Sequence, residues 1–153
     1  MNERETNHGK IVYLRKCLEG GYLLHGGKIR TDLLVPMQAK DDDTARKTGQ
    51  AFAIYAEATD IRIPILISLF AEKDTSKRSW RSEYTSHFPG PIKVGGENYT
   101  FTPGYVYVLP RESFTTEGNK YDYEYISRVP VVPKEVIAID PSILSVLEGI
   151  EFQ

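Results

Sequence analysis

The sequence predicts a single α+β domain, in which many short strands are combined with a few short helices. The 153 residues are enough to bury one core, and no segment reads as a linker between domains. Short apolar runs that end at glycine or proline recur along the chain, and such runs are typical of strands. Two segments, around residues 59–71 and 140–148, instead carry the start signals of helices.

Composition and charge restrict the class of protein. The net charge of −2 argues against a generally basic nucleic-acid surface. The one cysteine, Cys17, excludes an internal disulfide and a cysteine-rich zinc site. Residues 1–10 are polar, so we expect a loose N-terminal arm before a domain over 11–153. That start lacks the apolar core of a secretory signal, and the apolar run at 61–70 is too short to span a membrane, so we expect a cytoplasmic protein.

In the first half of the chain we expect strands at 11–14, 22–25 and 51–56, with a turn over 15–21. The apolar run 61–71 is rich in β-branched residues, which favour a strand. However, Thr59 and Asp60 are good N-cap residues, and Pro64 suits a first helical turn better than a central strand. We therefore predict a short buried helix there.

From Pro89 onward the pattern is mostly that of strands. Residues 92–94 and 99–101 flank Gly95-Gly96, which predicts a hairpin. The segment 105–109 is the clearest strand. Residues 121–127 alternate between aromatic and polar side chains, and 136–139 form a last strand candidate. Asp140-Pro141 then predicts a terminal helix over 142–148.

Three residues on these strands are candidates for a functional site. His25 ends a strand beside Gly26-Gly27, where bare backbone allows another group to approach closely. A hydrogen-bonded histidine before a turn would give the same pattern. Tyr55 suits a site or an ordinary core, and Glu124 could simply be an exposed carboxylate on an alternating strand. The three aspartates at 41–43 lack the spacing of a calcium loop, so we predict no metal site.

Taken in order, Leu24-His25-Gly26, Ala53-Ile54-Tyr55-Ala56 and Tyr123-Glu124-Tyr125 carry a histidine, a tyrosine and a glutamate on three of the predicted strands. This order resembles the His-Tyr-Glu signature of the diphtheria-toxin and poly(ADP-ribose)-polymerase branch of ADP-ribosyltransferases. The segment 104–108, with the later Pro130-Val131-Val132-Pro133, is similar to small bacterial and phage proteins of that fold. The likeness extends from Tyr22 to about Leu144.

The resemblance implies a split, twisted β-sheet with a few short helices that holds NAD⁺ in a cleft. In such a cleft His25 and the Gly26 backbone would bind the adenosine ribose, and Tyr55 would stack on the nicotinamide ring. Glu124 would stabilise the charge that develops at the anomeric carbon as nicotinamide leaves. The implied activity is transfer of ADP-ribose to a protein or nucleic-acid acceptor, without a metal.

The residue types suit this chemistry. A fixed carboxylate interacts more strongly with an oxocarbenium-like transition state than with the ground state. An aromatic face attracts a flat pyridinium ring. Two alternatives stay open at this stage. One is a domain of the same fold that has lost catalysis and binds a nucleotide or a partner. The other is a small β-rich interaction protein in which the His-Tyr-Glu order is coincidental.

Overall fold

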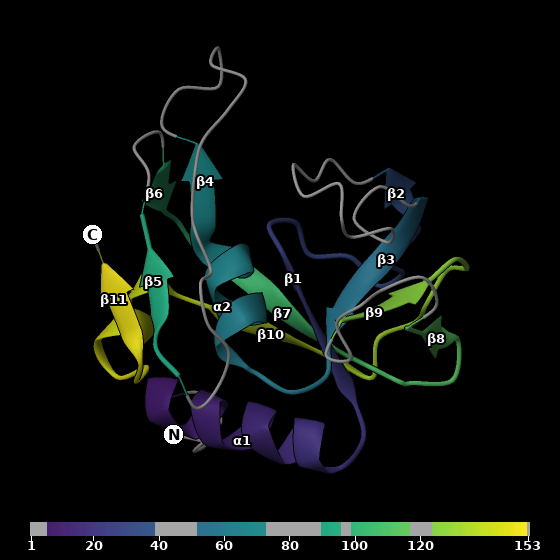
Figure 1. Cartoon of the computed structure of the whole chain (residues 1–153). Helices are drawn as coiled ribbons and strands as arrows, with labels where there is room; N and C mark the ends of the chain where they lie inside the picture. Colours follow the sequence, from purple (N-terminus) through teal and green to yellow (C-terminus); the bar gives the residue numbers. More distant parts are fainter. Residues whose placement is uncertain (1–5, 39–51, 73–89, 96–98, 117–123, 153) are drawn as a thin grey trace.

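The computed structural model describes residues 6–38, 52–72, 90–95, 99–116 and 124–152 (Figure 1). They form an α+β structure with helices α1 (Asn7–Glu19) and α2 (Arg62–Leu69) and the 3₁₀ helix η3 (Pro141–Ser145). The strands are β1 (Leu23–Gly27), β2 (Met37–Gln38), β3 (Phe52–Glu57), β4 (Phe70–Glu72), β5 (Ile92–Val94), β6 (Tyr99–Phe101), β7 (Gly104–Leu109), β8 (Phe114–Thr115), β9 (Glu124–Ser127), β10 (Glu135–Ile139) and β11 (Ile150–Phe152).

The main sheet has the strand order β10-β7-β1-β3-β9-β8, and β2 pairs with β3 beside this path. All of its pairings are antiparallel. The predicted strands at 22–25, 51–56, 105–109 and 136–139 are confirmed as β1, β3, β7 and β10. Of the strand predicted at 121–127, the described part forms β9, and residues 121–123 lie outside the described residues.

The main sheet has its shortest strand pairing between β1 and β3. β1 is paired with β7 along its whole length, from Leu23↔Leu109 to Gly27↔Tyr105. Between β1 and β3, in contrast, Leu24↔Glu57 is the single paired position. Beyond it the two strands spread apart, as Figure 1 shows. The sheet therefore consists of β10-β7-β1 and β3-β9-β8, joined at one point.

The N-terminal part of the chain corrects two predictions. Residues 7–10 are not a loose arm, and 11–14 is not a strand, because both belong to α1. The helix begins at Thr6, whose Oγ1 accepts a hydrogen bond of 2.9 Å from the Gly9 backbone N–H. Ile11, Leu14 and Cys17 are buried at helical spacing on one side of α1. The β-branched pair Ile11-Val12 had favoured a strand, but burial of this face outweighs that local preference.

The predicted helix at 61–71 is confirmed as α2, which packs on β1 and β7. Asp60 supports its start, since its Oδ1 accepts a hydrogen bond of 3.0 Å from the Arg62 backbone N–H. The contact with the sheet is so close that a Cβ on Gly26 would lie 2.3 Å from the Pro64 carbonyl oxygen. A Cβ on Gly104 would lie 1.9 Å from the carbonyl oxygen of Ser68. Glycine at both positions lets α2 reach the sheet.

The predicted hairpin of 92–94 and 99–101 is wrong. β5 instead pairs in parallel with β11, and β6 pairs with β4. The predicted terminal helix is shorter than expected: Asp140 accepts a hydrogen bond from the Ser142 backbone N–H, but η3 ends at Ser145 and is followed by β11. These pairings join distant segments, whereas the glycine pair at 95–96 is only a local signal.

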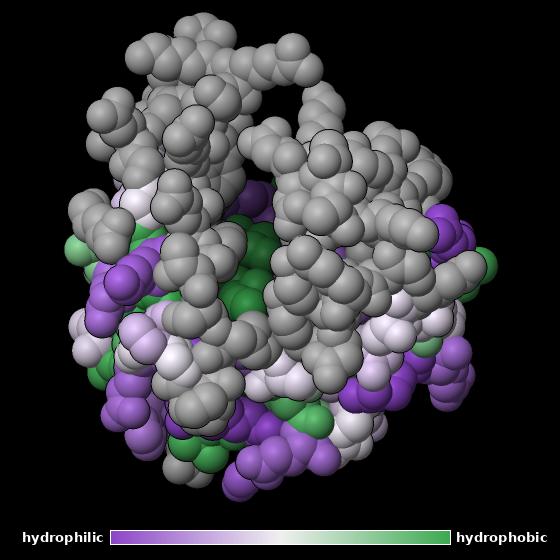
Figure 2. Space-filling view, in the orientation of Figure 1, coloured by the Kyte–Doolittle hydropathy of each residue, from purple (hydrophilic) through white to green (hydrophobic). Residues whose placement is uncertain are grey.

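Hydrophobic cores cover both faces of the main sheet. On one face α1, α2 and η3 bury a core that includes Leu14, Leu24 and Ile65. On the other face Leu23, Ile54, Ala56 and Tyr107 pack with Leu34 and Val131, which belong to two connecting segments joined by a bridge. Figure 2 shows apolar surface in the middle of the molecule, in the region where Figure 1 draws α2. No helix in the described ranges is long and apolar enough to cross a membrane.

Candidate functional site

His25 lies on β1 where this strand turns away from β3. Its Nδ1 is 2.5 Å from the carbonyl oxygen of Tyr55. A carbonyl oxygen only accepts hydrogen bonds, so Nδ1 carries a proton and donates it to this contact. Burial lowers the pKa of His25 below its ordinary value, and the Tyr55 carbonyl offsets this only in part. The imidazole is therefore neutral at pH 7, with an acceptor lone pair on Nε2.

A cavity of about 450 Å³ opens beside this histidine, between β1, β3 and the segment 28–37. Its size lies within the range of small-molecule sites. The walls are mostly apolar. The polar residues along the cavity are His25, Lys28, Thr31, Tyr55 and Tyr107. The cavity thus combines apolar walls with a few polar groups, as binding sites for small organic molecules do.

Tyr107 supports the wall of this cavity. Its ring centre lies 5.8 Å from that of His25. Its hydroxyl donates a hydrogen bond to the Ile29 carbonyl oxygen and accepts one of 3.0 Å from the Thr31 backbone N–H. A Cβ on Gly27 would lie 3.9 Å from His25 Nε2 and 3.3 Å from the Tyr107 ring. Glycine at this position therefore keeps the space next to Nε2 open.

Tyr55 lines the same cavity and is partly buried. Side chains alternate along a strand, and Ile54 and Ala56 pack in the core on the Tyr107 side. The Tyr55 side chain is therefore directed to the other face of β3, together with that of Glu57. Its backbone carbonyl, in contrast, meets His25. The structure brings His25 and Tyr55 together through this main-chain contact.

Glu124 is the first residue of β9 and is paired with Glu57. Tyr55 is paired with Ile126, two residues further along β9. Glu124 is thus the diagonal neighbour of Tyr55 on the same face of the sheet. The backbone positions of such diagonal neighbours in antiparallel strands are typically about 7–8 Å apart. It is not among the residues that line the cavity. His25 and Tyr55 therefore border one cavity, and Glu124 lies one diagonal step away.

Gly26 has a structural reason to be glycine. It lies on the face of β1 that meets α2, where a Cβ would also lie 2.9 Å from the Ser68 backbone nitrogen. His25 faces the opposite side of the strand. The close packing of α2 accounts for Gly26 without a ligand.

Glu57 is a titratable residue that sequence reasoning missed. It is 5% exposed. Its Oε2 accepts hydrogen bonds from the backbone N–H groups of Thr59 and Asp60, at 2.8 and 3.0 Å, and from the Thr59 hydroxyl at 3.0 Å. Burial raises the pKa of Glu57 to about 7, although these hydrogen bonds act in the opposite direction. Its position between a buried strand and the polar Thr59-Asp60 turn is the signal that could have identified it.

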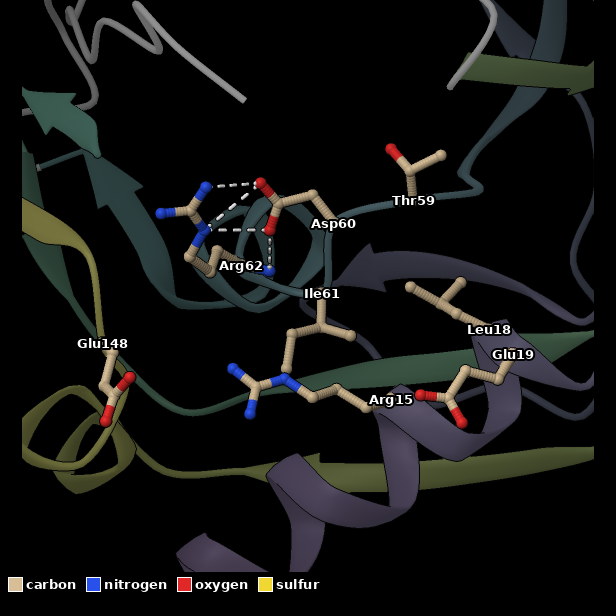
Figure 3. Close-up of a pocket in the computed structure, with 8 residues that line it drawn as sticks. All are labelled: Arg15, Leu18, Glu19, Thr59, Asp60, Ile61, Arg62 and Glu148. Atoms are coloured by element: carbon tan, nitrogen blue, oxygen red, sulfur yellow. Dashed lines mark hydrogen bonds and ion pairs between the residues drawn. The ribbon is translucent and has the colours of Figure 1, made fainter. Parts of the chain in front are cut away.

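A second cavity, of about 410 Å³, lies between the end of α1 and the turn before α2 (Figure 3). Its buried polar groups are paired with each other. Arg62 Nη2 is 2.7 Å from Asp60 Oδ2, and Arg62 Nη1 donates to the Gly149 carbonyl oxygen at 3.0 Å. Charges of both signs surround them, from Arg15, Glu19 and Glu148. This arrangement fixes the start of α2 to the C-terminal segment and is less suited to binding a ligand than the His25 cavity.

Across the parts of the chain that the structure describes, no group of three or more His, Cys, Asp or Glu side chains could hold a metal ion. The aspartates at 41–43 and the basic segment 73–87 lie outside the described residues. Comparisons with protein-family models, with curated proteins and with solved structures give no match to this chain.

Proposed function

We propose that this protein is an NAD⁺-dependent ADP-ribosyltransferase that transfers ADP-ribose to a protein or nucleic-acid acceptor and releases nicotinamide. The observation that carries the proposal is the contact between His25 Nδ1 and the Tyr55 carbonyl oxygen. It lies where β1 and β3 part, at the edge of a cavity of about 450 Å³. Two residues expected from the His-Tyr-Glu order thus meet where β1 and β3 separate.

The proposed role of His25 is to bind a ribose of NAD⁺. Because Nδ1 donates to the Tyr55 carbonyl oxygen, the tautomer and the orientation of the ring are determined. The neutral Nε2 can then accept a hydrogen bond from a ribose hydroxyl. Among the described residues Nε2 has no hydrogen-bond partner, and Gly27 leaves the space next to it open.

Tyr55 and Glu124 would act on the nicotinamide side of NAD⁺. The bond between the anomeric carbon and the pyridinium nitrogen breaks, and its electron pair stays with the departing nicotinamide. Positive charge then develops on the anomeric carbon and the ring oxygen of the ribose. The Glu124 carboxylate would stabilise this charge until a nucleophilic atom of the acceptor forms the new bond and loses its proton. The Tyr55 ring would stack on the pyridinium.

A specific observation favours a second candidate, a domain of the same fold that binds a nucleotide without catalysis. Glu124 does not line the cavity that His25 and Tyr55 share. In that case NAD⁺ or a related nucleotide would bind, but Glu124 would not reach the reacting carbon. A third candidate, a β-rich interaction protein, predicts no nucleotide binding.

The first experiment measures binding. Saturation-transfer NMR with NAD⁺ on the wild type should show transfer to both adenine and nicotinamide protons. His25→Ala should weaken it at least fivefold, since a hydrogen bond that positions the ligand contributes about 1 kcal/mol. His8→Ala is the matched control, because His8 is exposed on α1. No signal with the wild type at millimolar NAD⁺ would reject the proposed function and favour the interaction protein.

The second experiment measures catalysis without knowledge of the acceptor, because water can take its place. Release of nicotinamide from NAD⁺ should fall by about 10²–10³ in Glu124→Gln, since the amide removes the charge that acts in the transition state. Binding of NAD⁺ should change little. Unchanged release in a folded Glu124→Gln protein would refute the mechanism. Binding without any release by the wild type would favour the inactive domain.

A further inference from the structure

Lys28 directly follows β1 and lies at the edge of the His25 cavity. Its ammonium group is held in place by the turn between β6 and β7. Lys28 Nζ donates to the Thr102 hydroxyl at 2.7 Å and to the Thr102 carbonyl oxygen at 2.9 Å. A third contact, to the Pro103 carbonyl oxygen, is longer, at 3.5 Å. A flexible side chain is thus held at a defined position by the turn between β6 and β7.

The hydrogen bonds of this ammonium group leave capacity for a ligand. An ammonium has three N–H donors, and the two bonds to Thr102 use two of them. Within the described ranges, the third donor has only the 3.5 Å contact, which is at the limit of a hydrogen bond. It can be redirected to a stronger acceptor without breaking either bond to Thr102.

Among the residues that the structure describes, no carboxylate forms an ion pair with Lys28. No carboxylate lines the described part of the cavity. The nearby Arg30 and Asp32 form an exposed ion pair at 2.9 Å, so they neutralise each other. Partial burial lowers the pKa of Lys28, which means that its charge has lost some hydration without gaining an opposite charge. An anionic ligand group at this position would supply that charge.

We propose that Lys28 binds the phosphate groups of the ligand in the His25 cavity, so that this site selects a nucleoside diphosphate or dinucleotide over uncharged nicotinamide. The inference rests on the proposed function and adds a residue that determines the class of ligand. His25 and Lys28 are three residues apart, and both line the cavity. One nucleotide could therefore contact His25 through a ribose and Lys28 through a phosphate.

The test compares three ligands, NAD⁺, ADP and nicotinamide, by NMR titration of the wild type, Lys28→Gln and Lys134→Gln. Glutamine removes the charge but keeps an N–H donor for Thr102. Lys134→Gln is the matched control, because its ammonium lies 4.2 Å from the centre of the Tyr22 ring and does not line the cavity. Lys28→Gln should lower the affinity for ADP and for NAD⁺ by about fivefold, which is the effect expected for loss of a partly exposed charge pair. Lys134→Gln should weaken neither.

Two further readouts separate phosphate binding from a structural role of Lys28. Nicotinamide affinity should be equal in all three proteins, whereas a distorted cavity would lower it in Lys28→Gln. Raising the salt concentration should weaken ADP binding more in the wild type than in Lys28→Gln. If Lys28→Gln unfolds, Lys28→Arg provides the test, because it keeps the charge and should retain ADP affinity within about twofold.

Equal ADP affinities of Lys28→Gln and wild type would overturn the inference and leave the proposed function intact. A parallel loss of nicotinamide affinity would overturn it as well. The wild type could release no nicotinamide from NAD⁺ while Lys28→Gln still shows a fivefold loss of ADP affinity. That result would support phosphate binding by Lys28 and contradict the proposed catalytic activity. A wild type that binds neither ADP nor NAD⁺ would overturn both proposals.

Discussion

Replacing Glu57 by glutamine should change how the stability of the protein depends on pH. Glu57 is buried at the end of β3, and its Oε2 accepts three hydrogen bonds from Thr59 and Asp60. A glutamine oxygen can still accept bonds from these groups, but it cannot ionise. The substitution therefore removes the charge while keeping the side chain in nearly the same shape.

The size of the effect follows from the pKa, which burial raises from 4.5 to about 7. The folded protein thus holds this proton more tightly than the unfolded chain does. The resulting stabilisation is fully present below pH 4.5 and is lost as the pH rises through 7. At about 1.4 kcal/mol for each unit of pKa, the loss is about 3 kcal/mol. Little solvent screening applies, because the side chain is 5% exposed.

The contribution of His25 to the pH dependence of stability has the opposite sign, so it must be distinguished from that of Glu57. The pKa of His25 is lowered in the folded protein, so the unfolded chain holds the proton more tightly. Its contribution to stability therefore grows as the pH rises through the folded pKa toward the ordinary value of histidine. Because the wild type and Glu57→Gln both contain His25, the difference between their unfolding free energies cancels this term.

The assay is urea unfolding at several pH values from 5 to 8.5, at constant ionic strength. The free energy of unfolding of Glu57→Gln relative to the wild type should rise by about 2.5 kcal/mol across this range, because part of the loss occurs below pH 5. Glu112→Gln, the same substitution at an exposed glutamate, is the matched control. A constant difference for Glu57→Gln would refute the reasoning, because it would mean that this buried carboxyl does not titrate near pH 7.

The packing of α2 gives two further predictions, both measured by urea unfolding. Gly104→Ala should destabilise the protein by about 3 kcal/mol, because its Cβ would lie 1.9 Å from the Ser68 carbonyl oxygen. Gly27→Ala should destabilise it by less than about 1.5 kcal/mol, because the nearest atom to its Cβ would be 3.3 Å away. Equal effects would contradict the close approach of α2. Arg62→Met should cost about 3–5 kcal/mol, because it leaves the buried Asp60 carboxylate without its ion pair. A cost below about 1 kcal/mol would show that water or another group replaces the guanidinium.

Local patterns were sufficient to predict much of the fold. β1, β3, β7 and β10 are short apolar runs bounded by turn residues, and α2 follows Asp60 with Pro64 in its first turn. In these segments local propensity and tertiary burial agree. Where they disagree, prediction failed. The pair Ile11-Val12 favours a strand, but the helical spacing of Ile11, Leu14 and Cys17 allows α1 to cover the sheet.

The site was predictable in part. His25 stood out because a histidine at a strand end beside two glycines is an unusual local arrangement, and Tyr55 lies on a strand that the sequence predicted. Their contact was not visible in the sequence, because it depends on how far β1 and β3 separate after Leu24↔Glu57. In the sequence nothing distinguishes Lys28 from other surface lysines, because its contact with Thr102 joins residues far apart in the chain.

The sequence by itself determined the positions of β1, β3, β7, β10 and α2, since these follow from the spacing of apolar side chains and from capping residues within a few positions. Only the tertiary structure decided which strands pair and where the sheet narrows. It also decided which carboxyl, Glu57, is buried at a pKa of about 7. The reason is that pairing, burial and pKa depend on groups far apart in the chain, such as Ile92 and Ile150 in the parallel pair β5 and β11. Such contacts form only when the whole core is assembled.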